Sequence, residues 1–288
     1  MIPSEPIHSP LKPRHSFLEL HARERAQALL DAGTFRELLG PFDRLESPWL
    51  EPQGIVPESD DGVIIARGFI AGWDAVVVAI EGAFLGGSIG EVSGAKIAGA
   101  LELALRDCEQ GHPVYPVLSL ESGGVRLQEA NLGLNAIAEI SSAIVSLRRY
   151  VPVIGVITGM VGCFGGMSIA AGLCSYLIAT RAARLGLNGP EVIEQEAGIE
   201  EFDARDRQLI WSVDGGEQRY ACGLVDFLVE DDTPAIVATI QECFRRGLPA
   251  THRSTQVDSY RALFADIDLS EQLDSATART IFEKRGTR

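Results

Sequence analysis

The residues best placed for chemistry in this chain are glycines in two turns. Gly123 and Gly124 precede Val125 after one apolar segment, and Gly165 and Gly166 follow another. The first N–H groups of a helix have no intrahelical acceptor and lie at the positive end of its dipole, so such a turn can bind an oxyanion. Adjacent glycines also let a ligand approach the backbone. Tight helix–sheet packing is an equally good explanation of Gly165 and Gly166 at this point.

The second turn lies within residues 151–180, a run without a charged residue. About 20 apolar residues can cross a bilayer, so a membrane span is one interpretation. Six glycines, however, divide the run into a β-branched strand over 151–158, a turn, a short helix from about Gly165 and a strand over 175–179. We favour this second interpretation, the buried centre of an α/β domain, because patterned α/β segments lie on both sides.

A strand, a glycine turn and a helix occur twice in succession. A Val- and Leu-rich strand over 113–120 leads into a turn at 121–129 and a helix to about Arg149, and the run at 151–180 repeats this order. Right-handed crossovers place the two strands side by side, with both turns at the end of the sheet where open α/β sheets bind ligands. We therefore expect one N–H from each turn to point at the same oxygen, as in an oxyanion hole.

No protein nucleophile accompanies these donors. The histidines lie near the N-terminus or in turn and tail contexts, without a Ser-His-Asp or Cys-His arrangement. Cys163 beside the second turn is either a nucleophile or, as we favour, a small core thiol. The five cysteines are widely spaced, which predicts neither a disulfide framework nor a metal site. An oxyanion hole without a nucleophile suits enolate chemistry on a thioester better than hydrolysis.

The composition indicates one globular domain. The 288 residues are 46% hydrophobic, enough for a full core. Forty acidic against 25 basic residues give a net charge of −15, which argues against nucleic acid and membrane surfaces as partners. The cysteine pattern fits a reducing cytoplasm, and the Pro-rich N-terminus lacks the apolar part of a secretory signal. We expect a mobile segment over 1–15, the main domain over 16–250 and an extension over 251–288 that can fold against a partner.

Periodicity and capping signals predict the remaining elements of an α/β fold with a mostly parallel sheet. Two extended runs around Ala71 and Gly72 predict a hairpin of strands over 63–69 and 73–81. Thr233 is the expected N-cap of a late helix. The other expected elements are helices over 16–30, 94–110, 190–198, 203–213 and 233–247, a short helical turn over 35–39 and a strand over 225–229.

Several motifs occur in an order that resembles one family. They are GGSIGE at 86–91, KI at 96–97, SGGVRLQE at 122–129, the glycine pair at 165–166 and NGPEV at 188–192. Together they resemble the carboxyltransferase subunits of acyl-CoA carboxylases, which have the crotonase fold, a spiral of ββα units. ACGLVD at 221–226 is similar to a late crotonase element. The resemblance covers about residues 20–230, and the compact chain looks most like the β subunits of malonate decarboxylases.

The resemblance implies an activity. Such subunits decarboxylate a malonyl thioester, carried on the CoA-derived, phosphopantetheine-type arm of an acyl carrier protein, to acetyl thioester and CO2. It implies that the amides of Gly124 or Val125 and of Gly166 hold the thioester oxygen, where enolate charge develops, while Gly123 and Gly165 shape the turns.

The resemblance also implies a binding channel and leaves two side chains open. The residues expected to line the channel for the carrier arm are Gly86, Gly87 and Ser88. Lys96 either meets a phosphate or is simply solvated. Arg126 either pairs with Glu129, three residues further on, or contacts the ligand.

Partners follow from chain length. Single-chain carboxyltransferases carry two crotonase-like halves, so this chain is expected to need a homologous γ subunit and a carrier protein. It is expected to bind no cofactor itself, and biotin is compatible but not required. A biotin-dependent carboxyltransferase half is the alternative. Acetyl-CoA carboxylase β subunits, however, carry an N-terminal four-cysteine zinc ribbon, whereas the first cysteine here is Cys108. A scaffolding or membrane-anchored subunit is the third possibility.

Overall fold

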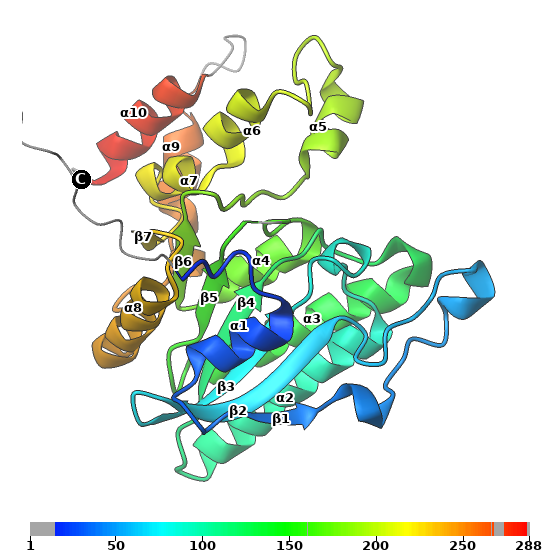
Figure 1. Ribbon diagram of the computed structural model, residues 1–288. Helices are drawn as coiled ribbons and strands as arrows, with labels where there is room; N and C mark the ends of the chain where they lie inside the picture. The colour runs from blue at the N-terminus through cyan, green and yellow to red at the C-terminus, as the bar shows by residue number, and fades with distance from the viewer. Residues whose placement is uncertain (1–14, 160, 266, 268–273, 287–288) are drawn as a thin grey trace, which may run out of the picture.

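The fold is built on one seven-stranded sheet whose strand order follows the chain order, β1 to β7 (Figure 1). The computed structural model describes residues 15–159, 161–265, 267 and 274–286. The first three strands pair antiparallel, and every later pair is parallel. This confirms the expected α/β class with a mostly parallel sheet. The strands are β1 (Arg36–Leu39), β2 (Val63–Ile70), β3 (Trp73–Ile80), β4 (Tyr115–Leu120), β5 (Ile154–Ile157), β6 (Tyr176–Thr180) and β7 (Phe227–Val229).

Helices cover both faces of the sheet (Figure 1). One face packs against α2 (Glu91–Glu109), α3 (Asn131–Leu147) and α4 (Gly165–Leu173). The other packs against α1 (Ala22–Leu29) and α8 (Thr233–Arg246). The remaining helices are α5 (Pro190–Ala197), α6 (Arg207–Asp214), α7 (Gly216–Ala221), α9 (Val257–Ala265) and α10 (Ser275–Gly286). Short 3-10 turns are η1 (Pro41–Asp43), η2 (Glu51–Gln53), η3 (Leu85–Gly87), η4 (Leu127–Glu129) and η5 (Arg253–Thr255).

The uncharged run at 151–180 forms β5, α4 and β6, as the glycine pattern predicted. Both strands are buried along their whole length, because helices lie on both faces of the sheet. In the part of the chain that the structure describes, no helix combines the length and apolar character that crossing a bilayer requires. The absence of charge therefore reflects burial within the domain.

Three local predictions were wrong. Where a helical turn was expected over 35–39, Arg36–Leu39 form β1, because Arg36 and Glu37 pair with Arg67 and Ala66 of β2. The N-cap of α8 is Asp232, and Thr233 is its first residue. The first helix begins at Ala22 rather than at residue 16. In the first case a tertiary contact overrides the local pattern.

The C-terminal extension folds back on its own chain. Residues of η5 pack against the end of α4, and the amide of Gln218 in α7 donates to the carbonyl of Ser275 at the start of α10 (3.0 Å). The rings of Phe264 and Phe282 lie 6.3 Å apart and join α9 to α10. Most of the predicted mobile segment over 1–15 falls outside the described residues.

Candidate active site

The two glycine turns lie directly beside each other. Ser122 and Cys163 form a parallel bridge just beyond β4 and β5. In this bridge the N–H of Ser122 donates to the carbonyl of Gly162 (2.7 Å), and the N–H of Phe164 donates to the carbonyl of Ser122 (2.8 Å). The parallel pairing of the sheet thus continues into the loops that carry the glycines. The expected proximity of both turns at the carboxyl edge of the sheet is present.

Within the two glycine turns, the N–H groups of Val125 and Gly166 have no acceptor among the described residues. Gly166 is the second residue of α4, so its N–H precedes the intrahelical ladder. Val125 bridges Ile89 through the carbonyl of Gly124 and the N–H of Arg126, which turns its own N–H to the other side.

The other amides of the two turns are already used. The N–H of Gly124 donates to the hydroxyl of Ser122 (3.1 Å). Gly123 donates to the carbonyl of Gly86, and Gly165 to that of Leu187, each at 2.8 Å. Of the two alternatives for the first turn, Val125 rather than Gly124 therefore has the available donor.

The turn at 86–88 packs against the first glycine turn. Gly87 has a φ of +64°, and a Cβ there would lie 1.8 Å from the carbonyl oxygen of Glu121, so only glycine fits. The hydroxyl of Ser88 is buried and has no hydrogen-bond partner among the described residues. This turn is thus in contact with the candidate site through the hydrogen bond from Gly123 to Gly86.

Glu121 is a residue of this site that sequence reasoning missed. Its side chain is 0% exposed and lies 3.6 Å from the guanidinium of Arg25. Its carboxylate accepts hydrogen bonds from the Thr158 hydroxyl (2.9 Å) and from the N–H groups of Gly159 (2.8 Å), Val161 (2.7 Å) and Gly162 (3.2 Å). It therefore fixes the loop that leads into the second turn. The sequence feature that could have identified Glu121 is an acidic residue at the end of an apolar strand, directly before Ser-Gly-Gly.

Arg126 is buried among internal hydrogen-bond and ion-pair partners. The side chain is 1% exposed, and its guanidinium donates to Asp61 (2.7 Å), Glu129 (2.9 Å) and the carbonyl of Ser88 (3.0 Å). Burial raises the pKa of Asp61 even though Arg126 opposes that shift. Of the two alternatives for Arg126, this geometry favours the structural ion pair.

Neither alternative for Lys96 fits the structure. The residue is 5% exposed, and its ammonium donates to the carbonyls of Asp60 and Val63. Burial lowers the pKa of Lys96. The side chain is neither solvated nor open to a phosphate, and instead ties α2 to the start of β2.

Cys163 lies in the core, as we favoured. It is 0% exposed, and burial raises the pKa of its thiol far above the usual range. A thiol that stays protonated and inaccessible is a poor nucleophile. The chemistry at this junction therefore rests on backbone donors.

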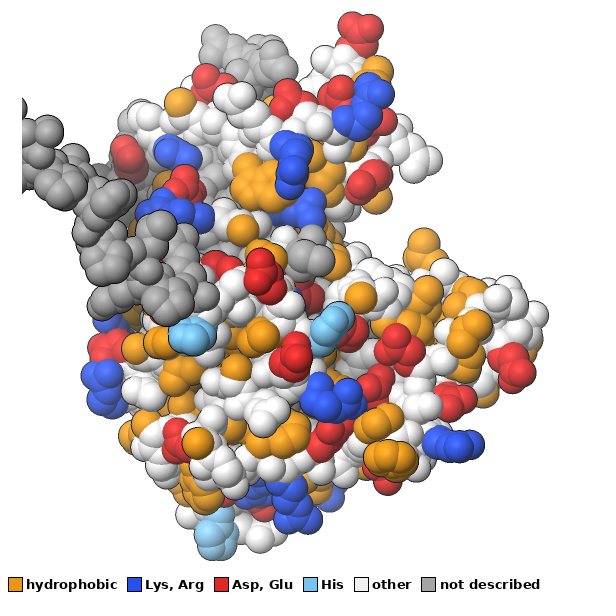
Figure 2. All heavy atoms as spheres, in the orientation of Figure 1, with side chains coloured by type: hydrophobic (Ala, Val, Ile, Leu, Met, Phe, Trp, Pro, Cys, Tyr) orange, Lys and Arg blue, Asp and Glu red, His pale blue; other side chains and the backbone are white. Residues whose placement is uncertain are grey.

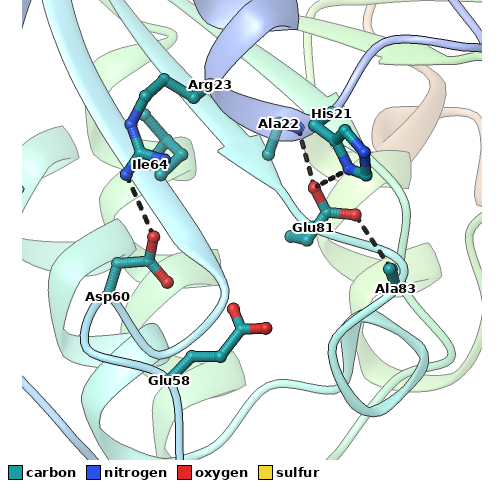
Figure 3. A pocket seen from close by; sticks show the side chains of 8 residues that line it. All are labelled: His21, Ala22, Arg23, Glu58, Asp60, Ile64, Glu81 and Ala83. Atoms are coloured by element: carbon teal, nitrogen blue, oxygen red, sulfur yellow. Dashed lines mark hydrogen bonds and ion pairs between the residues drawn. The ribbon is translucent and has the colours of Figure 1, made fainter. Parts of the chain in front are cut away.

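A separate cavity of about 250 Å³ lies at the end of β3 and contains none of the predicted site residues. It is lined by His21, Ala22, Arg23, Glu58, Asp60, Ile64, Glu81 and Ala83 (Figure 3). Burial and nearby Asp60 raise the pKa of Glu58. Although burial alone would raise the pKa of Glu81, hydrogen bonds from the N–H groups of Ala22 and Ala83 lower it. Three carboxylates around one space disfavour an anionic ligand.

The surface is hollowed beneath α5, where a notch separates α5 from the main body (Figure 2). Two exposed leucines lie beside the turns that carry the donors. Leu127 is 86% exposed and follows Val125 by two residues. Leu187 is 61% exposed, and its backbone carbonyl accepts a hydrogen bond from the N–H of Gly165. The site thus has an apolar, open border.

Comparison with known proteins identifies the family. Residues 14–277 match the carboxyl transferase domain. This chain belongs to the carboxyl transferase domain family. The crotonase-like fold expected from the motifs is therefore confirmed for this carboxyl transferase domain, as is the expectation of a carboxyltransferase-type enzyme subunit.

Individual relatives of this carboxyl transferase domain are similar over nearly its whole length. It is 40% identical over 269 residues to the malonyl-S-ACP:biotin-protein carboxyltransferase MADC of Malonomonas rubra, covering 90% of this chain and 83% of that protein. It is 62% identical to a chain of a Pseudomonas malonate decarboxylase hetero-tetramer crystallised with malonate, with a TM-score of 0.92 and coverage of 93% and 98%. It is 56% identical to a chain of a Pseudomonas MdcD-MdcE hetero-dimer, with a TM-score of 0.75 and coverage of 88% and 97%.

A more distant relative shows how this domain relates to longer chains. The transcarboxylase 12S structure with methylmalonyl-coenzyme A is 29% identical, with a TM-score of 0.66. The match covers 77% of this chain but only 40% of the 12S chain. This carboxyl transferase domain therefore corresponds to less than half of that longer protein.

Proposed function

We propose that this chain is the β subunit of a malonate decarboxylase, which converts a malonyl thioester on an acyl carrier protein to acetyl thioester and CO2. The observation that carries the proposal is the pair of unused N–H groups of Val125 and Gly166 on adjoining turns. The 62% identity to a chain of the Pseudomonas enzyme, and the malonyl-S-ACP named for the Malonomonas relative, support the choice of substrate.

The donors act on charge that appears during the reaction. The bond between the carboxylate carbon and the α-carbon breaks, CO2 leaves, and the electron pair moves through the α-carbon onto the thioester oxygen. The resulting enolate carries its negative charge on that oxygen, where Val125 and Gly166 donate hydrogen bonds. A proton then adds to the α-carbon and gives the acetyl thioester. Donors fixed in advance stabilise the enolate more than the neutral thioester, which accelerates the step.

We propose that the turn at Gly86, Gly87 and Ser88 borders the phosphopantetheine-type arm. This turn contacts the first glycine turn through the hydrogen bond from Gly123 to Gly86. The arm belongs to the carrier protein, so this chain needs no resident cofactor for carbon–carbon cleavage. Lys96 and Arg126 do not contact the substrate, because both are buried in internal contacts.

We propose that a homologous γ subunit covers the open side of the site. Leu127 and Leu187 are large apolar side chains exposed close to the donors, as an interface requires. The chain also corresponds to one part of a longer carboxyltransferase. The hetero-dimer and hetero-tetramer of the Pseudomonas relatives support the same arrangement. The expected cytoplasmic location stays a prediction.

The test uses the chain purified with its co-produced partner subunits. CO2 release from malonyl carrier protein is followed with and without avidin, and the isolated chain is assayed alongside. We expect turnover by the complex, none by the isolated chain and no effect of avidin. Turnover by the isolated chain would contradict the need for a second subunit.

The alternative function is a biotin-dependent carboxyltransferase half. One observation favours it, since the Malonomonas relative is a biotin-protein carboxyltransferase. The same backbone donors would serve an enolate formed in either reaction. Loss of product formation when avidin sequesters a biotinyl carrier would select this alternative over direct release of CO2.

A further inference from the structure

The C-terminal end of α4 is held by three side chains from two other segments. Arg148, just after α3, donates to the carbonyl of Leu173 (3.0 Å). His252, just before η5, lies 2.9 Å from the carbonyl of Cys174 through Nε2, and Arg253 donates to the same oxygen (2.6 Å). These three side chains form the α4 clamp. They satisfy the carbonyls that a helix leaves unpaired at its last turn.

The charges of the α4 clamp match the helix. The carbonyl end of a helix is its negative pole, and guanidinium groups stabilise it. Arg253 is itself anchored, because its second amino group pairs with Asp226. That carboxylate also accepts from the N–H of Leu177 in β6 (2.7 Å). The clamp thus ties α4 to the sheet through charged, directional contacts.

The opposite end of α4 carries the Gly166 donor. With nine residues, α4 is about 13 Å long, so its two ends move together as one rigid element. Its first residue is fixed by the hydrogen bond from the Gly165 N–H to the carbonyl of Leu187 (2.8 Å). An error of about 1 Å in the position of a reacting group can cost a factor of about 10² in rate.

We propose that Arg148, His252 and Arg253 are positioning residues, which hold the Gly166 N–H in place by clamping the far end of α4. This inference rests on the proposed role of Gly166 in the oxyanion hole. It assigns the start of the C-terminal extension a role in the site of its own chain, where the sequence suggested a partner contact.

The test compares Arg253→Met and Arg253→Lys in the complex with its partner subunits. Arg149→Met is the matched control, because Arg149 is the exposed neighbour of Arg148. We expect Arg253→Met to lower kcat about tenfold with KM changed less than twofold, Arg253→Lys to recover most of the loss and Arg149→Met to have no effect. Unchanged kcat in Arg253→Met, or a raised KM at unchanged kcat, would overturn the proposal.

A second measurement separates this proposal from the proposed function. Amide hydrogen exchange of the α4 peptides is followed in the folded full-length chain. We expect faster exchange of the Ser168 amide, which donates to the carbonyl of Phe164 at the start of α4, in Arg253→Met, and wild-type rates in Arg149→Met. If the wild-type complex fails to release CO2 but these exchange rates differ as expected, the result supports the α4 clamp and contradicts the proposed function. If the wild-type complex is active but exchange and kcat are unchanged in Arg253→Met, the result contradicts only the α4 clamp.

Discussion

Gly124 and Gly165 touch through their backbones: a Cβ added to either glycine would lie 3.0 Å from the Cα of the other. This contact brings the two turns together and leaves no room for a side chain. Both glycines also have positive φ values, +113° and +55°. The candidate oxyanion hole therefore depends on close packing of two backbones as well as on the donors.

Replacing Gly124 by Ala tests this contact. The variant should lose activity about 10²-fold, because the turns must separate. The positive φ should also cost about 1–2 kcal/mol of stability. Gly33→Ala is the control, since Gly33 has a φ of +79° with open space around it. Activity and free energy of unfolding are measured for both variants, and equal activities would disprove the importance of the contact.

Replacing Gly166 by Pro removes one proposed donor. Because one oxyanion-hole donor is worth about 10² or more in rate, kcat should fall by at least that factor. A Cβ at this position meets Ile137 at 2.8 Å, so both variants are made together with Ile137→Ala. Gly166→Ala with Ile137→Ala keeps the N–H and should remain much more active than Gly166→Pro with Ile137→Ala. Similar activities of the two folded variants would remove Gly166 from the site.

Replacing Glu121 by Gln tests the acid that fixes the second loop. The amide NH2 of Gln would face N–H donors that now point at a carboxylate oxygen. An unsatisfied buried group costs about 1–3 kcal/mol, so the free energy of unfolding should fall by that amount. Glu102→Gln, at an exposed position of α2, should leave it unchanged. Denaturant unfolding measures both, and equal midpoints would refute the structural role.

Replacing Arg126 by Met distinguishes the ion pair from a ligand contact. Asp61 and Glu129 would remain buried without their cation, which typically costs about 3–5 kcal/mol. The folded fraction of the variant should keep the KM of the wild-type complex for malonyl carrier protein. Arg149→Met is again the exposed control. A tenfold higher KM at unchanged stability would instead restore the ligand contact.

His252 predicts a dependence of stability on pH. Burial, together with Arg148 and Arg253, lowers its pKa in the folded chain below the usual value of about 6.5. The unfolded chain therefore binds more protons just below pH 6.5, and the stability contributed by neutral His252 declines as pH falls through that range. Gln does not titrate but can still donate to the carbonyl of Cys174. We expect the wild-type advantage in unfolding free energy over His252→Gln to shrink between pH 7.5 and pH 5, and a constant difference would contradict this.

The glycine turns could be predicted from the sequence because their signals are local. Glycine pairs between an apolar strand and a helix define a turn, and Ala71 and Gly72 define the hairpin in the same way. Alternating strands and helices were enough to predict a parallel sheet with both turns at one edge. Knowing which N–H is free required the structure, since the Ser122 hydroxyl occupies that of Gly124.

Long-range pairing could not be predicted from one sequence. Arg126 pairs with both Glu129 and Asp61. The pair with Glu129, three positions away, could be proposed from the sequence, but the pair with Asp61, 65 positions away, could not. Glu121 binds N–H groups about 40 positions further along the chain. His252 and Cys174 are 78 positions apart. Local periodicity contains no information on such contacts, which form when elements pack.

The strand order of the sheet has a consequence for synthesis of the chain. Each new strand pairs with the strand made just before it, so the sheet can grow along one edge as the polypeptide leaves the ribosome. His252 and Arg253, which bind the carbonyl of Cys174 at the end of α4, are translated about 80 positions after that helix. A nascent or truncated chain that stops before them therefore has its glycine turns but not the support at the far end of α4. Support of the Gly166 turn within this chain would then be complete only after residue 253 has been translated, and the partner subunit would bind after that.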